Sequence, residues 1–181
     1  MNASRTSGQV VLVNAHDDAI GTMEKMEAHR LGKLHRAFSI FLFDPDGRML
    51  LQQRAADKYH SPGLWSNACC SHPRPGEDVA SAAYRRLGEE LGVTVRLEKR
   101  FAFTYHAHFA NGLQEHEFDH VLFGAFNGNL HPDPTEVMAV RWLPPEELSA
   151  EIASTPEAFT PWLRICWPQV IEHLQREPVL P

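Results

Sequence analysis

Histidine and glutamate residues occur in this sequence at spacings that could bind a metal ion. The chain of 181 residues contains 11 histidines, and histidine is the commonest metal ligand among side chains. His29 and His35 precede the first long apolar run, and His72 lies in a proline-rich loop. Glu115 and Glu117 stand two apart on a predicted strand, so both face one side, although alternating polar residues also typify an exposed strand. Together they form a candidate ligand set for Mn²⁺, Zn²⁺ or Mg²⁺.

A second acidic group lies on the most regular amphipathic segment, behind a loop rich in proline and glycine. Glu77, Glu89 and Glu90 offer oxygen ligands for a hard divalent cation such as Mg²⁺, which would bridge to the phosphate oxygens of a substrate. The alternative is that Arg85 and Arg86 form solvated ion pairs with the glutamates one turn away, worth roughly a few tenths of a kcal/mol each. The segment alone leaves both interpretations open.

A cysteine two residues before a histidine is the third candidate. Cys70 and His72 could belong to a metal site, a thiolate nucleophile or a thiol that transfers protons. A structural zinc site needs four ligands, and no second pair of this kind occurs in the sequence. Burial without chemistry is the alternative for any cysteine, and it suits Cys166 best. Three cysteines, two of them adjacent, are a poor disulfide framework and indicate a reducing cytoplasm.

The elements that must position these residues are strands and helices in mixed order. The clearest helix carries Val79, Ala83, Leu87 and Leu91 on one apolar stripe. Residues 55–75 are predicted to be irregular, and a long loop of this kind is usually functional. The predicted strands cover residues 10–14, 37–43, 49–54, 93–108, 115–126 and 140–143, and the predicted helices cover 23–29, 77–91, a helix opening at 144–148, and 158–175.

This order of elements predicts a mixed α/β or α+β sandwich of a single domain, with a core over about residues 8–170. Asp44-Pro45-Asp46-Gly47 predicts a tight hairpin. The formal net charge of -6 argues against a protein that grips nucleic acid. No apolar run approaches the ~20 residues of a membrane span. We therefore expect a cytoplasmic protein that is a monomer or a weak dimer.

The acidic helix and its flanks, from Gly76-Glu77 to Gly92-Val93, resemble the Nudix box. Two positions depart from that pattern: Ser71 stands where it has its first glycine, and Arg86 where it has a glutamate. In Nudix hydrolases that glutamate and the one matching Glu90 ligate metal together. Arg86 replaces a ligand with a guanidinium fork that binds phosphate, so the site suits holding a diphosphate better than hydrolysing one.

Motifs along nearly the whole chain match a narrower pattern. They are Lys25, Ala28-His29, His35-Arg36-Ala37-Phe38, Gln53-Arg54-Ala55, Lys58, Pro62-Gly63-Leu64-Trp65-Ser66-Asn67, Cys70-Ser71-His72-Pro73, Glu115-His116-Glu117 and Phe159-Thr160-Pro161-Trp162. From about residue 8 to residue 167 the chain thereby resembles the type 1 isopentenyl-diphosphate isomerases, a branch of the Nudix superfamily. The cysteine loop and the Glu115-x-Glu117 strand are specific, because generic Nudix hydrolases have neither.

The resemblance implies a Nudix-type mixed sheet flanked by helices and an isomerase that interconverts isopentenyl and dimethylallyl diphosphate through a carbocation. Cys70 and Glu117 are implied as the acid–base pair, with Tyr105 hydrogen-bonded to Glu117, and which of the two donates in the forward direction stays open. A thiol with a pKa of ~8.5 is mostly protonated at neutral pH and can donate. The metal bound by the histidines and glutamates above would tune Glu117.

The implied substrate is a small isoprenoid diphosphate held by cationic side chains. Those implied to bind it are Lys25, Arg54, Lys58 and Arg86. A second ion, Mg²⁺, would bridge the diphosphate to Glu90. Trp162 would offer its ring face to the carbocation, a contact that reaches ~2 kcal/mol when desolvated. Packing in the last helix is an equally good interpretation of Trp162.

Two other functions are compatible with parts of the pattern. A Nudix hydrolase acting on a nucleoside diphosphate derivative is the enzymatic alternative, and Arg86 and the cysteine loop argue against it. A catalytically silent module that binds a diphosphate to regulate a partner is the other. The presence of both Cys70 and Glu117 argues against that reading.

Overall fold

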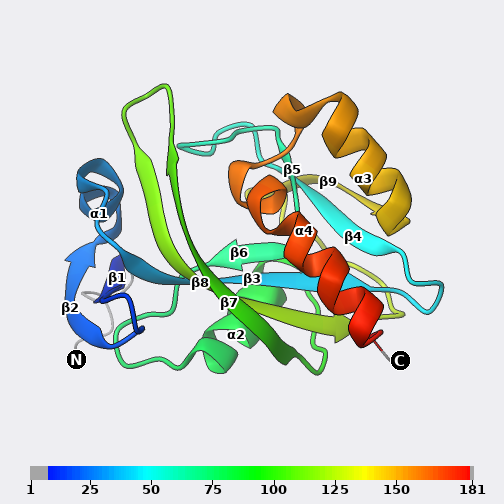
Figure 1. Ribbon diagram of the computed structural model, residues 1–181, viewed down its shortest axis with the longest axis horizontal. Helices are drawn as coiled ribbons and strands as arrows, with labels where there is room; N and C mark the ends of the chain where they lie inside the picture. Colours follow the sequence, from blue (N-terminus) through cyan, green and yellow to red (C-terminus); the bar gives the residue numbers. More distant parts are fainter. Residues whose placement is uncertain (1–7, 180–181) are drawn as a thin grey trace.

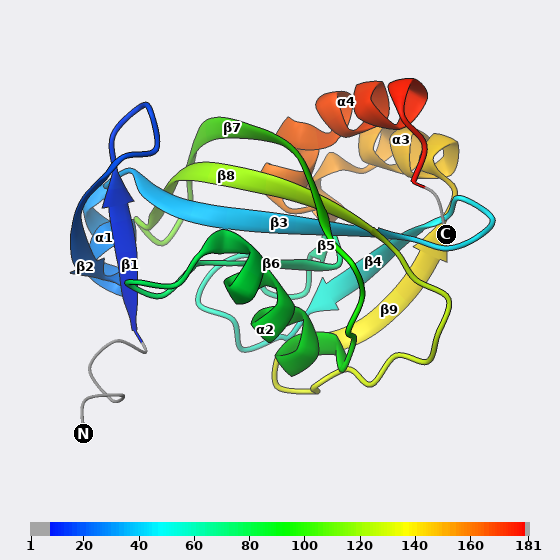
Figure 2. The same ribbon diagram turned by 90° about the horizontal axis from the view of Figure 1, so that it is seen from below.

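The strand from 35 to 43 lies at the centre of the fold because it is apolar on both faces. In the computed structural model, which describes residues 8–179, Phe38, Ile40 and Leu42 of this strand pack in one buried cluster, and Phe41 and Phe43 pack in a second one on the opposite face. A strand that is apolar on both sides must be covered on both sides. Helices accordingly lie above and below the sheet (Figures 1 and 2).

The elements follow one another in mixed order along the chain (Figure 1). They are β1 (Gln9–Val13), β2 (Ala19–Glu24), α1 (Lys25–Leu31), β3 (His35–Phe43), β4 (Met49–Arg54), β5 (Trp65–Ser66), β6 (Cys69–Ser71), α2 (Val79–Leu91), β7 (Glu98–His108), β8 (Gln114–Ala125), β9 (Val137–Leu143), α3 (Pro145–Ser154), a 3₁₀ turn (Pro156–Ala158) and α4 (Pro161–Arg176). No helix within the described residues is both long and apolar enough to cross a membrane. The predicted α/β class with a mixed sheet is confirmed.

The sheet joins strands from distant parts of the sequence. β3 pairs in parallel with β8 over its whole length, from His35↔Glu117 to Phe43↔Ala125, and antiparallel with β6. β7 pairs antiparallel with β8, and this long ribbon runs beyond the body of the sheet (Figure 1). β4 pairs with β3 only at Phe43↔Met49 and then with β9 and β5. The predicted hairpin is thus only a turn, after which its two strands diverge.

Helix α2 covers one face of the sheet, and α3 and α4 cover the other (Figure 2). The predicted stripe of α2 is largely confirmed, since Ala83, Leu87 and Leu91 are fully buried. The helix begins two residues later than predicted because the side chain of Asp78 caps it, accepting a hydrogen bond from the Ser81 amide at 2.9 Å. Gly92 ends it in the left-handed conformation, with a φ of 65°.

Other predicted bounds are also wrong. The strand predicted from residue 93 begins at Glu98, and the strand predicted from residue 140 begins at Val137, where it pairs with Arg54 of β4. The helix predicted from residue 23 begins at Lys25, because residues 19–24 form β2 and pair with β1, and Glu24 caps the helix. The last helix begins at Pro161, because Pro156–Ala158 forms a separate 3₁₀ turn. The segment 55–75, predicted to be irregular, contains the short strands β5 and β6. Pairing with β3 and β4 stabilises these two strands, and no local pattern in the sequence signals them.

Candidate active site

A cavity of about 270 Å³ opens where the sheet meets α1, α2 and α4. Its walls collect polar and charged side chains that are far apart in the sequence. Of the residues predicted to do chemistry, those lining the cavity are Lys25, Arg54, Lys58, Cys70, His72, Arg86, Glu90, Tyr105, Glu115, Glu117 and Trp162. His29 and His35 lie fully buried beside it.

The row of strands β6, β3, β8 and β7 places the central side chains on one face. Cys70 of β6 is the register partner of Ser39 of β3, and Tyr105 of β7 is the partner of Glu117 of β8. Because strand side chains alternate between faces, Glu115 and Asp119 share the face of Glu117. All three acids are buried, with exposures of 5% or less.

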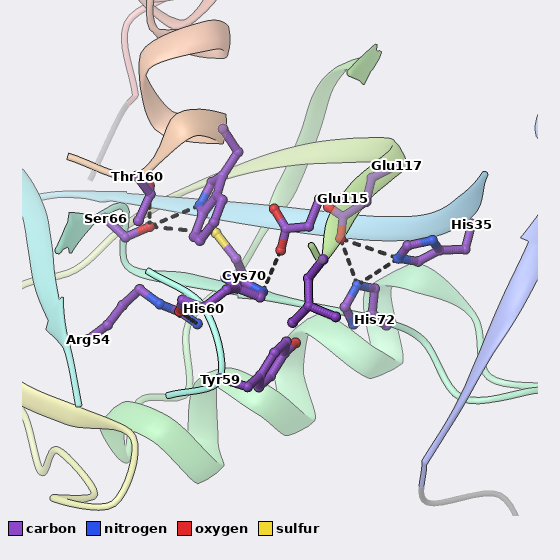
Figure 3. A network of polar contacts seen from close by, with 12 residues as sticks. His35, Arg54, Tyr59, His60, Ser66, Cys70, His72, Glu115, Glu117 and Thr160 are labelled. Carbon is purple, nitrogen blue, oxygen red and sulfur yellow. Dashed lines mark hydrogen bonds and ion pairs between the residues drawn. The ribbon is translucent and has the colours of Figure 1, made fainter. Parts of the chain in front are cut away.

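Three imidazoles and one carboxylate converge at the end of this row. The ligand atoms of His29, His35, His72 and Glu117 all lie within 4.8 Å of one another. His72 Nε2 is 2.8 Å from Glu117 Oε1 and 3.2 Å from His35 Nε2 (Figure 3). His35 donates its Nδ1–H to the Lys33 carbonyl at 2.7 Å, which leaves Nε2 directed at the group.

The chemistry of this group fits a divalent metal ion. Burial, followed by the neighbouring His72 and His35, lowers the pKa of His29 to about 2, so its ring is neutral, as a metal ligand must be. Both ring nitrogens of His29 are buried without a hydrogen-bond partner among residues 8–179. An unpartnered buried imidazole is costly unless something binds its lone pair. Imidazole nitrogens with carboxylate oxygens suit zinc and manganese.

The pKa values of His35 and Glu117 move together. Burial disfavours the charge on each and is the largest single effect, but the charges and hydrogen bonds around the two groups together outweigh it. The pKa of His35 is raised, and the charges and hydrogen bonds of His72 and His35 hold the pKa of Glu117 well below its usual value. The site therefore favours positive charge next to Glu117.

The fifth predicted ligand, Glu115, lies outside the group of four. Its Oε1 is 2.8 Å from His60 Nε2 (Figure 3), and its Oε2 accepts from the Tyr105 hydroxyl at 2.9 Å. The same hydroxyl lies 2.7 Å from Glu117 Oε2. A phenol has one proton, so it donates to only one of these carboxylates at a time. Tyr105 thus connects Glu115 to Glu117.

The thiol of Cys70 faces the cavity and donates to Asn67 Oδ1 at 3.0 Å. The amide of Asn67 is fixed, because its Nδ2 donates to the carbonyls of Ile40 and Cys69, each at 3.0 Å. Its oxygen must therefore point at the thiol. Burial, and then the charge of Asp119, raise the pKa of Cys70. The thiol is protonated at neutral pH.

Adjacent Cys69 faces the opposite side of β6. It is fully buried in the cluster that α2 covers, with Ala68 and Leu87. Ser39 supports Cys70 from the neighbouring strand, at 3.5 Å between Oγ and Sγ, and donates to Asp119 Oδ2 at 2.7 Å.

The predicted phosphate-binding cations are held close together by acids. Lys58 and Arg86 both form ion pairs with Glu136, and Arg86 donates to Glu90 Oε1 at 2.6 Å. Burial, and then the charges of Lys58 and Arg86, lower the pKa of Lys25. Three cations therefore crowd one wall of a cavity that suits a polyanion.

The acidic helix uses its glutamates in different ways. Glu77 accepts two hydrogen bonds from Arg85, both at 2.8 Å, and Glu89 is an exposed partner of Arg85 and Arg86. Only Glu90 lines the cavity, where Gln52 Nε2 also donates to it at 3.0 Å. Burial raises its pKa, although the charge of Arg86 opposes this.

Trp162 combines the two roles considered for it. Its ring is 2% exposed and packs in the core cluster under α4, yet it also lines the cavity. Its Nε1–H donates to Ser66 Oγ at 3.0 Å, and the Arg54 guanidinium lies 5.2 Å from the ring centroid. The ring is therefore rigidly placed against the cavity.

Several residues of this site had no predicted role, among them His60, Glu136 and Ser39. His60 Nε2 lies 2.8 Å from Glu115 Oε1, and its ring stacks on Phe109 with a centroid distance of 4.7 Å. Glu136 pairs with the cations, and Ser39 with Cys70 and Asp119. Ser39 is the one polar residue inside the apolar run 37–43, which is a usable signal. Glu136 and His60 carry no comparable signal.

A family model described as "NUDIX domain" matches residues 33–163. Among solved structures, the Deinococcus radiodurans protein DR0079 aligns with a TM-score of 0.76 at 22% identity, covering 89% of this chain and 98% of the other. A MutT protein from Methanosarcina mazei aligns with a TM-score of 0.64 at 14% identity, covering 77% and 94%. These matches define a Nudix-type fold around the cavity.

Curated proteins of similar sequence indicate a particular group within the Nudix family. An isopentenyl-diphosphate Delta-isomerase 2 of Aromatoleum aromaticum is 52% identical over 90% of this chain and 86% of its own length. The enzyme of Nocardia farcinica with the same activity name is 53% identical over 85% and 89%. The chain therefore belongs to the Nudix family and, within it, to the isopentenyl-diphosphate Delta-isomerases.

Proposed function

We propose that this chain interconverts isopentenyl diphosphate and dimethylallyl diphosphate. The observation that carries the proposal is that Cys70 and the Glu117–Tyr105 pair face one cavity whose wall also carries Lys25, Lys58 and Arg86. An acid, a base and a diphosphate site around one cavity are what a proton-shift isomerase requires. The sequence relationship to named isomerases supports the same activity.

The cationic wall binds and orients the substrate diphosphate. Arg86 and Lys58 exchange their bonds to Glu136 for phosphate oxygens, and Lys25 and Arg54 complete the positive wall. A Mg²⁺ ion carried with the diphosphate would be held by Glu90, whose carboxylate lies beside Arg86. Binding at this end fixes the five-carbon tail between Cys70 and Glu117.

Isomerisation adds one proton to C4 of the isopentenyl double bond and removes one from C2, leaving the new double bond between C2 and C3. The reaction is reversible, so each of the two groups, Cys70 and Glu117, donates in one direction and accepts in the other. Tyr105 holds Glu117 at 2.7 Å and offers it a proton path to Glu115. Asn67 keeps the thiol of Cys70 in place.

Of the two proton-transfer groups, Cys70 and Glu117, only Glu117 belongs to the candidate metal site. His29, His35, His72 and Glu117 would hold one divalent ion, Mn²⁺, Zn²⁺ or Mg²⁺. Glu115, which lies outside this group in the structure, would have to turn from Tyr105 and His60 to become the fifth ligand. When bound, the ion supplies positive charge that favours the ionised form of Glu117. The histidines by themselves orient that carboxylate through the contacts at 2.8 and 3.4 Å.

The intermediate is a tertiary carbocation, which water would capture. The aromatic ring of Trp162 lines the cavity and offers its face to positive charge. His60, stacked on Phe109 and 5.7 Å from the Trp162 centroid, closes the same side. Both rings exclude water from the tail of the substrate.

The decisive experiment follows isopentenyl diphosphate in D₂O with Mg²⁺ by NMR. We expect deuterium in the methyl groups of a dimethylallyl product and no released phosphate. Release of phosphate or of a nucleotide without an allylic product would support the hydrolase alternative and contradict the proposal. Binding of the diphosphate without any turnover would favour the silent binding module.

The proposal also includes the setting in which the enzyme works. The three cysteines are free thiols, which suits the cytoplasm. The substrate is a small diphosphate, and no nucleic acid or membrane enters the reaction. We expect a monomer or a weak dimer, and sedimentation velocity over a range of protein concentrations tests this.

A further inference from the structure

Three histidines gather on the outer face of the β7–β8 ribbon, away from the cavity. His106 and His108 stand two apart on β7, so they share one face, and both are exposed. His116 of β8 is the register partner of His106. The ring centroids of His106 and His108 lie 4.5 Å apart, as do those of His106 and His116.

Hydrogen bonds fix which nitrogen stays free on two of these rings. His116 Nδ1 lies 3.1 Å from the Gly32 carbonyl oxygen, which can only accept, so Nδ1 carries the proton. His106 Nε2 lies 2.8 Å from Gln114 Oε1, also an acceptor. The unprotonated nitrogens, Nε2 of His116 and Nδ1 of His106, are therefore available. Histidines that bind metals have their other N–H held by a carbonyl or carboxylate in this same way.

We propose that His106, His108 and His116 form a second metal site that takes a borderline divalent transition ion such as Zn²⁺ or Cu²⁺. Imidazole is the ligand that these ions prefer, and three imidazoles leave room for water to complete the coordination. Chelation requires His106 and His108 to turn out of their stacked arrangement so that their free nitrogens converge with that of His116. Both rings are exposed, and the turn exchanges the stacking of His106, and its hydrogen bond to Gln114, for a bond to the ion.

This site is distinct from the buried group because it lies on the other face of the same ribbon. Glu115 and Glu117 flank His116 in sequence and point inward, and Tyr105 and Ala107 alternate with the two exposed histidines in the same way. An ion held by β7 and β8 would join the two strands and tie them, through the Gly32 carbonyl, to the end of α1. The site stands independently of the proposed isomerase activity.

The test counts zinc sites on the metal-stripped full chain by competition with a chromophoric zinc indicator. The natural sequence should bind one equivalent more than the double variant H106Q/H108Q. The single variant His108→Gln should weaken that equivalent by about 10–100-fold. His16→Gln is the matched control, since His16 is also exposed but lies in the β1–β2 turn, and it should change nothing.

Stability supplies a second readout. An ion that binds only the folded chain raises its melting temperature, so zinc should stabilise His16→Gln more than H106Q/H108Q. Equal stoichiometry in the natural sequence and the double variant would overturn the proposal, as would equal loss in His16→Gln. Far-UV circular dichroism verifies that the double variant is folded.

Discussion

Two adjacent cysteines lie in chemically different surroundings because they stand on a strand. Cys69 packs against the core beneath α2, whereas Cys70 faces the cavity beside Asn67 and Ser39. Burial raises the pKa of both thiols, so neither is a ready nucleophile. What separates them is access to substrate, and only Cys70 has it.

Substitution should separate these two residues clearly. Cys70→Ala removes one proton-transfer group and should lower kcat at least ~100-fold, and Cys70→Ser should also be severely impaired because a hydroxyl is a much poorer acid. Cys69→Ala should retain activity and lose about 1 kcal/mol of unfolding free energy through lost packing. Steady-state kinetics and urea unfolding measure the two effects. Loss of activity in Cys69→Ala with retention in Cys70→Ala would reverse the assignment.

Single substitutions also test the composition of the buried metal group. His29→Ala and His72→Ala each remove a ligand and should lower bound metal and activity together. Glu115→Gln should lower both as well if Glu115 is the fifth ligand, although in the structure it accepts a hydrogen bond from Tyr105 and lies against His60 instead. Elemental analysis after dialysis, with circular dichroism as a folding control, measures this. Full occupancy in all three variants would refute the ligand set.

At the scale of the elements, local patterns predicted some segments and missed others. Helix α2 was predictable because its apolar stripe repeats along the sequence, and β3 because it is a continuous apolar run. Strands β5 and β6 were not predictable. They are only two and three residues long, and they form because β4 and β3 pair with them. The same contrast holds for the site. The predicted metal ligands belong to motifs that the sequence shows, whereas the positions of His60 and Glu136 depend on tertiary contacts.

Two glycines of the same helix should respond oppositely to alanine. Gly92 has a φ of 65°, and a Cβ there would lie 2.8 Å from His131 Cβ, so Gly92→Ala should lose about 1 kcal/mol or more. Gly88 lies inside α2, where a Cβ would meet nothing closer than 4.0 Å, so Gly88→Ala should gain about 0.5–1 kcal/mol. Urea unfolding gives both values. Changes of the same sign would contradict this account of the helix end.

The pair of Glu77 and Arg85 should make the anchoring of α2 depend on pH. Hydrogen bonds from Arg85 lower the pKa of Glu77 from its usual 4.5. A lowered folded-state pKa contributes stability above about pH 4.5, and this contribution disappears as the pH falls through the folded-state pKa. Arg85→Gln should therefore cost about 1 kcal/mol at pH 7 and progressively less below pH ~4.5. An equal cost at every pH would show that the ion pair contributes nothing.

At the scale of the whole molecule, the fold concentrates opposite charges in different places. The formal net charge of -6 repels a diphosphate at long range. Lys25, Lys58 and Arg86 on one wall of the cavity provide local positive charge that opposes this repulsion. Glu115, Glu117 and Asp119 come from strand β8, whereas the three cations come from α1, α2 and the loop between β4 and β5. We expect the strand to supply the proton-transfer and metal-binding groups and the other elements to supply the groups that bind the diphosphate.

The same central strands make the two core clusters one cooperative unit. Phe38 and Ile40 of β3 pack in the cluster under α2, and Phe41 packs in the cluster under α4. Because the two clusters share this strand, unfolding of one should also unfold the other. Leu87→Ala and Leu163→Ala remove fully buried side chains on opposite sides, and each should cost about 2–5 kcal/mol. Both should shift a single transition, seen alike by far-UV circular dichroism and tryptophan fluorescence. Two separate transitions, each moved by only one of these substitutions, would show that the chain folds as two independent units rather than as the single domain predicted.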